Sequence, residues 1–519
     1  MSGTSAGTAG RPPAQVAALD HRDADWSGLR VVVAGIGVSG FAAADALAER
    51  GAAVVLVDGR DGAAERERAQ VLDTLGVDVR LGEAWVGGSG ASGALPAVRG
   101  GAPDLVVTSP GWRPDQPLLA AAGRAGVPVW GEVELAWRLR ARTGAAPWLT
   151  VTGTNGKTTT VRMLESMLRA GGLRAIGAGN VGTPLLEVVL HPQPYDVLAV
   201  ELSSFQLHWS HSLRPQASAC LNIAPDHLDW HGSAAAYAAA KGRVYTDTER
   251  ACVYNAADPA TEALVGGADV QPGCRAVGFT LGVPSVSMLG VVEDVLCDRA
   301  FVEQRATSAA EIGTLDDVRT ATGGTLAPHA VANALAAAAL ARAHGVAPGA
   351  VRDGLRGFVP EPHRIARVAE HAGVTWIDDS KATNPHAADA ALRAFDSVVW
   401  VAGGLAKGAD FGDLVARHAG RLRAAVLIGR DRGLVRQALE RHAPQVPVVE
   451  LDPGDTGAVA GAEALMDRVV ERAAALARPG DTVLLAPACA SMDQFDSYAH
   501  RGVAFAAAVR RSPAVAEDG

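Results

Sequence analysis

The chain has 519 residues, of which 48% are hydrophobic and 20% are charged, and its formal net charge is −9. This length predicts several domains, and the composition is typical of a soluble globular protein. The negative charge argues against a nucleic acid or an anionic membrane as a partner. Because no apolar leader and no run of about 18 apolar residues occurs, we expect no membrane span and a cytoplasmic location.

The cysteines and the N-terminal segment carry no sign of a disulfide framework or a metal cluster. The five cysteines are scattered, without metal-ligand spacing, at Cys220, Cys252, Cys274, Cys297 and Cys489. This usage fits a reducing compartment. Residues 1–26 are rich in Gly, Ala, Ser and Pro, and we expect a disordered tail there.

Short apolar runs alternate with alanine-rich helical stretches, which predicts parallel sheets covered by helices. Strands are expected at 29–34, 53–57, 105–108, 148–152, 197–201, 217–222, 374–378, 398–402, 424–428 and 482–486, and helices at, for example, 41–50 and 161–170. Breaks before Trp148 and near Pro360 predict three domains, over residues 27–143, 144–360 and 361–519. The expected class is therefore α/β, with a Rossmann-like first domain, a central parallel sheet of P-loop ATPase type and a Rossmann-like last domain. Residues 87–96 form a low-complexity loop, and residues 308–325 a polar stretch of unclear structure.

Most of the distinctive polar clusters follow directly after a predicted strand. They are found at 35–40, 153–158, 202–206, 379–384, 403–410 and 487–495. Since ligands of open α/β sheets bind outside the carboxyl ends of the strands, these clusters are the candidate functional site.

The segment Thr-Gly-Thr-Asn-Gly-Lys-Thr-Thr, residues 152–159, follows a strand and opens a helix. Its glycines let the backbone wrap a phosphate, the helix N-terminus binds the anion and Lys157 adds a positive charge. Thr158 is placed to reach Mg²⁺. The usual Walker spacing has glycine where this chain has Val151, so the segment is a shortened variant. The alternative is an ordinary glycine turn with a surface lysine.

A second glycine-rich segment, residues 35–40, follows the first predicted strand, and Asp58 ends the next strand at about the dinucleotide-fingerprint distance. The segment predicts binding of a dinucleotide or of another diphosphate, such as a nucleotide sugar. Asp58, Gly59 and Arg60 are then expected to contact ribose or phosphate. A purely structural strand–helix turn is the alternative.

Carboxylates and a histidine follow two further strands of the central domain. Glu201 ends one of them and suits a hard cation, while Asp226 and His227 follow the other. His227 is a candidate metal ligand, with a structural histidine as the alternative. Lys241 lies among alanines and, on composition alone, is a solvated lysine.

The last third of the chain carries charged and hydroxyl groups at several strand ends. These clusters comprise His363-Arg364, Asp378–Asn384, Gly403–Gly408 and Ala488–Phe495. Together they suit a small dianion bound beside a nucleotide, although each alone could be a solvated loop. Cys489 is expected to pack rather than to react, because no histidine lies near it in sequence.

Taken together, these segments resemble the Mur ligase family of bacterial peptidoglycan synthesis, from about Trp26 to about Phe505. The features similar to the whole family are Thr152–Thr159, Glu201–Gln206, Asp226-His227 and His363-Arg364. The stretch Asp379–Asn384, with Lys407 and Pro487–Phe495, is similar to the D-glutamate-adding branch. The Asp-Asn-Pro-Arg stretch of the diaminopimelate-adding relatives does not occur.

The resemblance implies an ATP-dependent amide ligase that adds D-glutamate to UDP-N-acetylmuramoyl-L-alanine through an acyl phosphate. It implies two Mg²⁺ ions and a carbamylated Lys241, which reverses the interpretation of Lys241 as a solvated side chain. It also implies three domains, which bind UDP, ATP and the amino acid respectively. We expect a monomer.

The residues carried over by this resemblance fall into four groups. Implied catalytic residues are Lys157, His227 and Lys241, and implied metal ligands are Thr158, Glu201 and His227. Implied ATP contacts are Gly153, Thr154, Asn155, Gly156, Lys157, Thr158, Thr159, Asn333, Arg364, Asp379 and Lys381. Implied contacts of the UDP substrate are Val38, Ser39, Asp58, Arg60, Ser109, Gly111, Asn180 and Gln206, and those of D-glutamate are Thr383, Lys407, Ser491 and the backbone near Tyr498.

Two positions depart from the family pattern, and two other functions compete with this one. Ala330 stands where relatives often have asparagine, and Gly59 where a hydroxyl residue can occur. A folylpolyglutamate synthase-like ligase, or another amino-acid-adding enzyme, would share the loop and the metals but would lack the combination of Asp379–Asn384 and Ser491–Phe495. An NAD(P)-dependent oxidoreductase would use the first glycine turn but would not need Lys157, Glu201 and His227.

Overall fold

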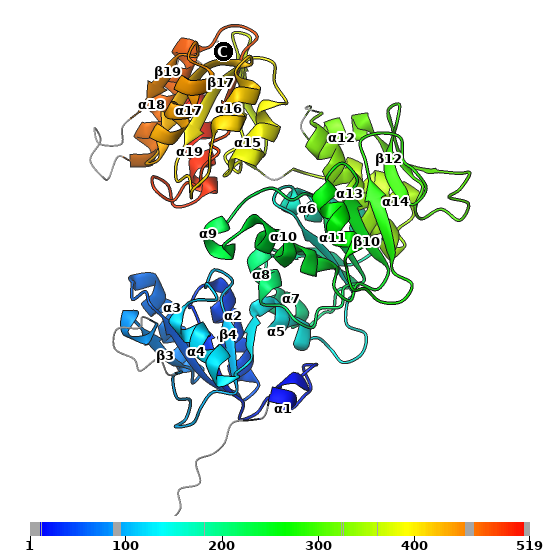
Figure 1. Cartoon of the computed structure of the whole chain (residues 1–519), viewed down its shortest axis with the longest axis vertical. Helices are drawn as coiled ribbons and strands as arrows, with labels where there is room; N and C mark the ends of the chain where they lie inside the picture. The colour runs from blue at the N-terminus through cyan, green and yellow to red at the C-terminus, as the bar shows by residue number, and fades with distance from the viewer. Residues whose placement is uncertain are drawn as a thin grey trace, which may run out of the picture.

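The computed structural model describes residues 11, 13–86, 95–180, 182–322, 324, 326–360, 362–451 and 461–512. The chain folds into three α/β lobes, each built around one sheet, and the predicted class is confirmed (Figure 1). The N-terminal lobe is blue to cyan, the central lobe runs from cyan through green to yellow-green, and the C-terminal lobe is yellow to red. The predicted boundaries near residues 143 and 360 stay predictions. The low-complexity loop at 87–96 lies mostly outside the described residues.

The N-terminal lobe has a five-stranded parallel sheet in the order β3-β2-β1-β4-β5. Its strands are β1 Arg30–Ala34, β2 Ala53–Asp58, β3 Asp78–Leu81, β4 Leu105–Thr108 and β5 Val129–Gly131. Its helices are α1 Pro13–Ala17, α2 Val38–Glu49, α3 Ala63–Thr74, α4 Pro117–Ala125 and α5 Glu132–Arg138, with the 3-10 turn η1 Glu83–Trp85. The strands β1 and β2 are buried along their whole length, as near-continuous apolar runs in a covered parallel sheet should be.

The prediction of a disordered tail over residues 1–26 is wrong for its described part. Residues 13–17 form α1, and the side chains of Val16, Leu19 and Trp26 are buried. Three apolar side chains spaced along this segment supply enough buried surface to order it against the lobe. Residues 1–10 and 12 lie outside the described residues.

The central lobe has a nine-stranded sheet in the order β14-β13-β12-β11-β10-β9-β6-β8-β7. Its strands are β6 Trp148–Thr152, β7 Ala175–Gly179, β8 Val197–Glu201, β9 Ala217–Cys220, β10 Ala251–Asn255, β11 Arg275–Phe279, β12 Met288–Val292, β13 Val295–Asp298 and β14 Ala310–Thr314. Its helices are α6 Lys157–Ala170, α7 Leu185–Val189, α8 Ser204–His208, α9 Leu228–His231, α10 Ala234–Gly242, α11 Pro259–Gly266, α12 Leu315–Ala321, α13 Pro328–His344 and α14 Pro348–Arg356, with the 3-10 turn η2 Arg243–Tyr245.

The central sheet is parallel from β7 to β12 and then antiparallel through β13 and β14. This antiparallel edge was not predicted. The polar stretch at 308–325 contributes β14 and α12, and a capping box between Thr314 and Asp317 begins that helix.

The C-terminal lobe has a six-stranded sheet in the order β15-β16-β20-β17-β18-β19, parallel except for the hairpin of β15 and β16. Its strands are β15 Ala366–His371, β16 Val374–Asp378, β17 Val398–Gly403, β18 Leu422–Ile428, β19 Val448–Glu450 and β20 Thr482–Leu485. Its helices are α15 Pro385–Leu392, α16 Gly412–His418, α17 Arg432–His442, α18 Gly461–Leu476 and α19 Tyr498–Arg511.

The lobes are joined in two different ways. One apolar core cluster runs from Trp26 and Leu29 of the N-terminal lobe to Trp148, Leu198 and Tyr245 of the central lobe. The buried members of the two clusters in the C-terminal lobe all come from residues 374–509. The first two lobes therefore share a core, whereas the third lobe has its own.

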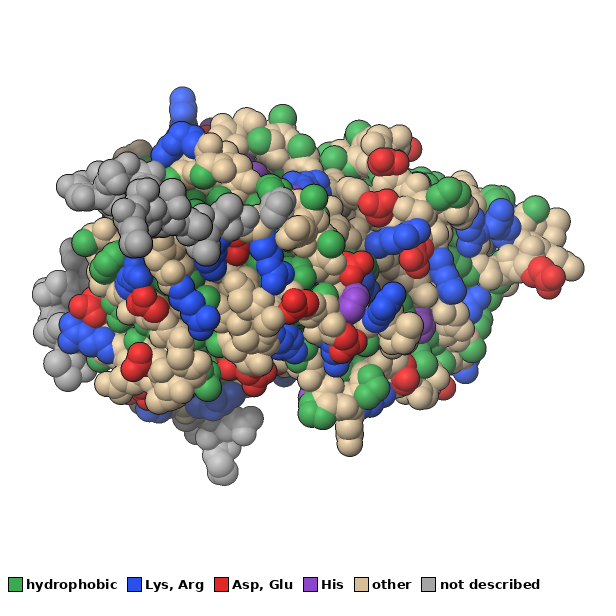
Figure 2. Space-filling view, turned by 90° about the horizontal axis from the view of Figure 1, so that it is seen from below, with side chains coloured by type: hydrophobic (Ala, Val, Ile, Leu, Met, Phe, Trp, Pro, Cys, Tyr) green, Lys and Arg blue, Asp and Glu red, His purple; other side chains and the backbone are tan. Residues whose placement is uncertain are grey.

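The described surface carries charges of both signs. On the face drawn in Figure 2, Lys and Arg side chains are intermingled with Asp and Glu. None of the described helices has the length and apolar character needed to cross a bilayer.

Candidate active site

The segment after β6 folds as a phosphate-binding loop. β6 ends at Thr152, α6 begins at Lys157, and both flanking glycines have positive φ, 151° at Gly153 and 85° at Gly156. L side chains rarely adopt such angles, which explains the glycines. The first amides of α6 have no acceptor within the helix, so the helix N-terminus can bind an anion.

Gly156 is required for a second reason, the approach of Asn333 from α13. A Cβ atom on Gly156 would lie 2.4 Å from the Asn333 Oδ1 atom. Asn333 is 5% exposed, so it cannot swing away into solvent. The structure thus places Asn333 against the phosphate loop, while its predicted contact with ATP stays a prediction.

Two lysines meet at the loop, the half-buried Lys157 and the buried Lys241. Lys157 Nζ donates to the carbonyl oxygens of Gly153 and Thr154 at 2.9 and 3.0 Å. Lys241 Nζ, on α10, donates to the same Gly153 carbonyl at 2.8 Å and to Thr152 Oγ1 at 3.4 Å. The composition-based interpretation of Lys241 as a solvated lysine is wrong, because the side chain is 2% exposed.

The two lysines share one electrostatic environment. Burial lowers the pKa of Lys157. Burial, and then the charge of Lys157, lower the pKa of Lys241 to about 7. A substantial fraction of Lys241 is therefore a neutral amine near neutral pH.

Glu201 presents a carboxylate oxygen at the end of β8. Its Oε1 atom accepts a hydrogen bond from Asn180 Nδ2 at 2.9 Å, while its buried Oε2 atom has no hydrogen-bond partner. A buried carboxylate oxygen without a partner is costly, and a hard cation such as Mg²⁺ would satisfy it. Thr158 is also buried, on the first turn of α6.

His227 lies beside Asp226, with 3.6 Å between Nε2 and the Asp226 Oδ2 atom. Burial lowers the pKa of His227, which favours the neutral ring that a metal ligand needs. In the described residues, no three His, Cys, Asp or Glu side chains converge on one point. The protein would thus supply only part of a metal's coordination sphere, as is usual for Mg²⁺.

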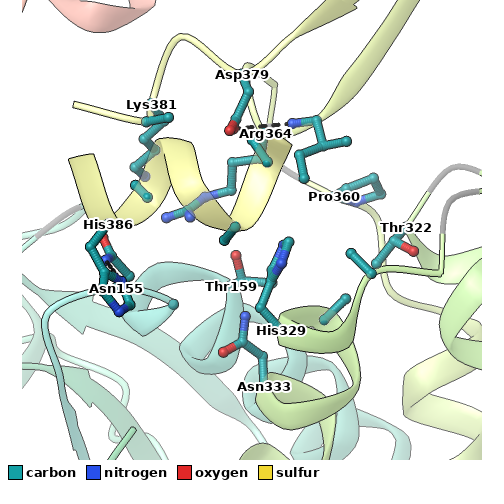
Figure 3. A pocket seen from close by; sticks show the side chains of 18 of the residues that line it. Asn155, Thr159, Thr322, His329, Asn333, Pro360, Arg364, Asp379, Lys381 and His386 are labelled. Carbon is teal, nitrogen blue, oxygen red and sulfur yellow. Dashed lines mark hydrogen bonds between the residues drawn. The ribbon is translucent and has the colours of Figure 1, made fainter. Parts of the chain in front are cut away.

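A pocket of about 160 Å³ opens beside the phosphate loop, between the central and C-terminal lobes. Side chains of His329, Asn333, Arg364 and Asp379 line it from different elements (Figure 3). Burial raises the pKa of Asp379 to about 8, although Arg364 opposes the shift. Burial lowers the pKa of His329 to about 4. A neutral imidazole and nearby amide groups suit a flat, polar nucleobase. Ala330 lines the same pocket.

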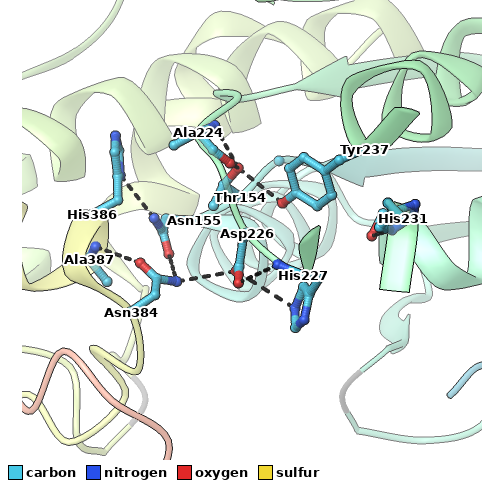
Figure 4. A network of polar contacts seen from close by, with 12 residues as sticks. Thr154, Asn155, Ala224, Asp226, His227, His231, Tyr237, Asn384, His386 and Ala387 are labelled. Atoms are coloured by element: carbon cyan, nitrogen blue, oxygen red, sulfur yellow. Dashed lines mark hydrogen bonds and ion pairs between the residues drawn. The ribbon is translucent and has the colours of Figure 1, made fainter. Parts of the chain in front are cut away.

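The C-terminal lobe reaches the phosphate loop through side chains just after β16. Lys381 Nζ donates to Thr158 Oγ1 at 3.3 Å, and Asn155 Nδ2 lies 3.0 Å from His386 Nδ1. Asn384 Nδ2 lies 3.4 Å from Asn155 Oδ1 and 3.5 Å from Asp226 Oδ2. Figure 4 shows this network running from α15 to His227. These polar contacts connect lobes that have separate apolar cores.

The residues predicted to bind D-glutamate lie at neighbouring strand ends. The loops after β17 and β20 are tied by an antiparallel bridge between Leu405 and Ala490. Ser491 is buried, Lys407 is exposed, and Lys381 Nζ lies 5.2 Å from the ring centroid of Tyr498. Lys407 is near enough to His227 to lower the pKa of that histidine, after burial and the opposing effect of Asp226. Thr383, between Lys381 and Asn384, is partly buried.

Arg501 and His386 were not predicted. Arg501 is 1% exposed, and its guanidinium donates to Ser380 Oγ and to the carbonyl oxygens of Ser380 and Cys489. It ties together the loops that follow β16 and β20. Neither residue carries a local sequence signal beyond lying near a strand-end cluster, because the partners of each are more than ten residues away.

The first glycine turn, residues 35–40, is filled by a carboxylate, whereas the phosphate loop is filled by a lysine. The Asp58 Oδ2 atom accepts a hydrogen bond from the Ile36 amide at 2.8 Å, and Arg60 pairs with the same carboxylate at 3.0 Å. Burial would raise the pKa of Asp58, but these hydrogen bonds hold it below its usual value. Ser109 Oγ is buried without a hydrogen-bond partner.

The remaining predicted contacts of the UDP substrate lie on two lobes. Val38 and Ser39 begin α2, with Val38 62% exposed, and Gly111 follows β4. Asn180 and Gln206 belong to the central lobe. Gln206 is buried and completes a capping box with Ser203, so it also stabilises the start of α8.

Two family models match most of the last two lobes. The model described as "Mur ligase middle domain" matches residues 151–341, and the model described as "Mur ligase, glutamate ligase domain" matches residues 363–489. The crystal structure of UDP-N-acetylmuramate-alanine ligase MurC from Thermotoga maritima has the same fold. It is 18% identical, with a TM-score of 0.51, over 92% of this chain and 98% of that chain.

Closely similar curated proteins cover nearly the whole chain. The UDP-N-acetylmuramoylalanine–D-glutamate ligase of Streptomyces avermitilis is 61% identical over 94% of this chain and 99% of its own length. The ligase of the same name from Mycolicibacterium smegmatis is 48% identical over 93% of this chain and 97% of its own length. At this identity and coverage, the chain belongs to the Mur ligase family.

Proposed function

We propose that this protein is the ATP-dependent ligase that joins D-glutamate to UDP-N-acetylmuramoyl-L-alanine in peptidoglycan synthesis. The proposal rests on the contact between a cluster of the central lobe and a cluster of the C-terminal lobe. The phosphate loop of the central lobe faces the strand-end cluster of the C-terminal lobe, with Lys381 Nζ 3.3 Å from Thr158 Oγ1. The near full-length similarity to D-glutamate ligases supports the choice of acceptor.

The first chemical step turns a carboxylate, which is a poor electrophile, into an acyl phosphate. A carboxylate oxygen of the L-alanyl group attacks the γ-phosphorus of ATP, the bond to the bridging oxygen breaks and ADP leaves. Lys157 and the first amides of α6 hold the transferring oxygens and offset their charge. Lys157 must leave the carbonyl oxygens of Gly153 and Thr154 to do so.

The partnerless Oε2 atom of Glu201 and the hydroxyl of Thr158 are the groups that would hold one Mg²⁺ ion, and His227 would hold a second. Mg²⁺ supplies neutralisation of the charge on the phosphoryl group. Asn180 fixes the Glu201 side chain through its hydrogen bond to Oε1.

Lys241 is proposed to be carbamylated. A neutral amine adds to CO₂, a C–N bond forms and one proton is lost, which turns the side chain into a carboxylate. Burial next to Lys157, with a pKa of about 7, favours this change, because the product is an anion beside a cation. The carbamate would support the second ion, which His227 alone cannot hold.

In the second step the amino group of D-glutamate attacks the acyl carbon, the amide forms and phosphate leaves. Lys407, Thr383, Ser491 and the backbone near Tyr498 are proposed to bind the two carboxylates of this amino acid. Lys381 lies between Thr158 and Tyr498, where it can contact both the nucleotide and the amino acid.

The remaining assignments follow the three lobes. Residues 27–143 would bind the uridine diphosphate, residues 144–360 ATP, and residues 361–519 the incoming amino acid. Val38, Ser39, Ser109 and Gly111 would contact the substrate at the strand ends of the first lobe. A monomer suffices, because one chain supplies every residue in these roles.

An acceptor screen tests the proposal directly. The purified enzyme is incubated with ATP, Mg²⁺ and UDP-N-acetylmuramoyl-L-alanine, and each of D-glutamate, L-alanine, meso-diaminopimelate and L-lysine is added separately. Product formation with D-glutamate alone is expected. Equal or faster product formation with any of the other three would contradict the proposed acceptor.

A further inference from the structure

A second pocket lies where the N-terminal and central lobes join, away from the phosphate loop. It has a volume of about 230 Å³, and the residues that begin β6 and β8, including Trp148 and Leu198, line it. The phosphate loop follows the opposite end of β6. At about 3.3 Å per residue, the length of that strand separates the two sites by roughly 13 Å.

The polar groups of this pocket are cationic or neutral. Arg22 and Arg140 both line it, and none of its described lining residues is acidic. Burial lowers the pKa of Arg140 to about 10, and the charge of Glu249 opposes the shift. Glu249 itself pairs with Arg214, at 3.6 Å. The Arg140 guanidinium is half-buried, and its Cζ atom lies 3.0 Å from the centroid of the Trp137 ring, a cation–π contact that offsets part of its desolvation. No described carboxylate pairs with it, so an anion in the pocket would add the missing opposite charge.

Several donors at this pocket have no acceptor. The buried Nε atom of Arg22 and the buried indole Nε1 atom of Trp148 lack hydrogen-bond partners. Arg22 donates from Nη2 to the Val189 carbonyl, and Arg140 donates from Nε to the Trp137 carbonyl. Both arginines therefore keep donors for a ligand, and planar guanidinium groups match carboxylate and phosphate oxygens.

We propose that this junction pocket binds a small organic anion, with its carboxylate or phosphate group between Arg22 and Arg140. The pocket is smaller than most drug-sized sites, and its other walls are largely apolar, with His191 and Tyr195 at the segment before β8. The ligand is therefore a single-ring or short-chain anion rather than a nucleotide. It stabilises the junction, because Arg22 belongs to the N-terminal segment and Trp148 to the central sheet.

Calorimetric titration of inorganic phosphate and of benzoate tests this site and distinguishes the two anion classes. The enzyme is held in saturating AMP-PNP and Mg²⁺ at constant ionic strength, so that the phosphate loop is filled. The variants are Arg22→Gln, Arg140→Gln and Arg140→Lys, and Arg142→Gln is the matched control. Arg142 is exposed, lies two residues along the linker and does not line the pocket.

We expect the wild type and the control to bind at least one probe with equal affinity, and Arg22→Gln and Arg140→Gln to bind it about tenfold or more weakly. Arg140→Lys keeps the charge and should lie between them, which preserves the test if Arg140→Gln fails to fold. Equal affinity in Arg140→Gln and Arg142→Gln would overturn the proposal, and so would a wild type that binds neither probe.

Discussion

Two glycine-rich turns of this protein join a buried strand to a helix in the same way but have opposite charges inside. In the N-terminal turn, the carboxylate of Asp58 accepts the Ile36 amide. In the central turn, the ammonium group of Lys157 fills the loop and Lys241 lies behind it. A carboxylate repels phosphate oxygens, whereas these two lysines attract them.

A glycine turn therefore fixes the backbone path but not the ligand. The charged side chains that fill the turn decide the ligand. With Asp58 and its partner Arg60 at its mouth, the first turn suits a uridine ribose and a diphosphate held at its edge. The second turn suits phosphates inside the loop. Five changes, ordered from the largest expected effect to the smallest, test this difference.

Replacing Lys157 with methionine removes the central cation and should have the largest effect. Loss of a group that stabilises charge in the transition state costs roughly 10²–10³-fold in kcat. Steady-state assay of phosphate release measures the loss. Arg169→Met is the control, since it removes a positive charge from the last turn of the same helix. A kcat of Lys157→Met within tenfold of the wild type would show that the central turn does not depend on this cation.

Lys241→Ala tests the second lysine and its carbamate, with an expected loss of about 10²-fold if one metal-supporting group is removed. A small added carboxylic acid should restore part of the activity. In the wild type, the pKa of about 7 means that the neutral amine, which alone reacts with CO₂, increases as the pH rises through 7.

Carbon-13 NMR with labelled bicarbonate should therefore show a carbamate signal that grows from pH 6 to pH 8 and is absent in Lys241→Ala. A wild type without this signal, or a variant with full activity, would remove the carbamate from the mechanism.

Gly156→Ala tests the backbone of the central turn, and Gly37→Ala is its counterpart in the N-terminal turn. Gly156 has a φ of 85°, and its Cβ would lie 2.4 Å from Asn333 Oδ1. Gly37 has a φ of −63°, and nothing lies within 4 Å of its Cβ. Strain of about 1–3 kcal/mol predicts that Gly156→Ala raises the KM for ATP roughly 10–100-fold. Equal KM values for ATP in the two variants would show that the central turn can relax.

Asp58→Asn removes the carboxylate from the first turn but keeps its size. We expect about a tenfold rise in the KM for the UDP substrate, because a charged hydrogen-bond acceptor for Ile36 and Arg60 is lost. The KM for ATP should stay the same, since Asp58 is on the other lobe. Initial rates with each substrate varied in turn separate the two constants. A rise in the KM for ATP alone would contradict this assignment of Asp58.

His386→Ala should have the smallest effect, about a threefold rise in the KM for ATP. It removes one neutral hydrogen bond to Asn155 across the junction. His386→Gln should restore most of it, and His442→Ala, an exposed histidine on the same lobe, is the control. If kcat falls in His386→Ala while the KM is unchanged, the contact acts after ATP has bound.

The strands that hold the site were predictable because they are continuous apolar runs. The expected 148–152 and 197–201 agree with β6 and β8, and the clusters after them meet as parallel topology requires. The helices after both glycine turns begin earlier than expected, at Val38 and Lys157. The turns give no side-chain capping signal at these starts, since glycine is the N-cap in both.

The antiparallel edge of the central sheet could not be predicted in the same way. β12, β13 and β14 are four or five residues long, and only part of each is buried. In β13 and β14 a carboxylate, Asp298 or Glu311, also interrupts the apolar run. Their pairing depends on neighbours in space, which a local pattern does not encode.

The burial of Lys241 and Arg501 could not be predicted from the local sequence either. Lys241 stands among alanines in a short helix, which is the pattern of a solvated side chain. Its burial comes from the phosphate loop, about ninety residues earlier in the chain, because its ammonium group donates to Gly153. Arg501 was missed for the same reason, since its partners Ser380 and Cys489 come from two other loops.

The most direct test of the central claim is the dependence of phosphate release on both substrates. The enzyme is given ATP and Mg²⁺ with UDP-N-acetylmuramoyl-L-alanine, with D-glutamate, with both or with neither. An ATP-driven ligase with an acyl-phosphate intermediate should release phosphate continuously only when both are present. Continuous release that is unchanged when either substrate is left out would contradict the account.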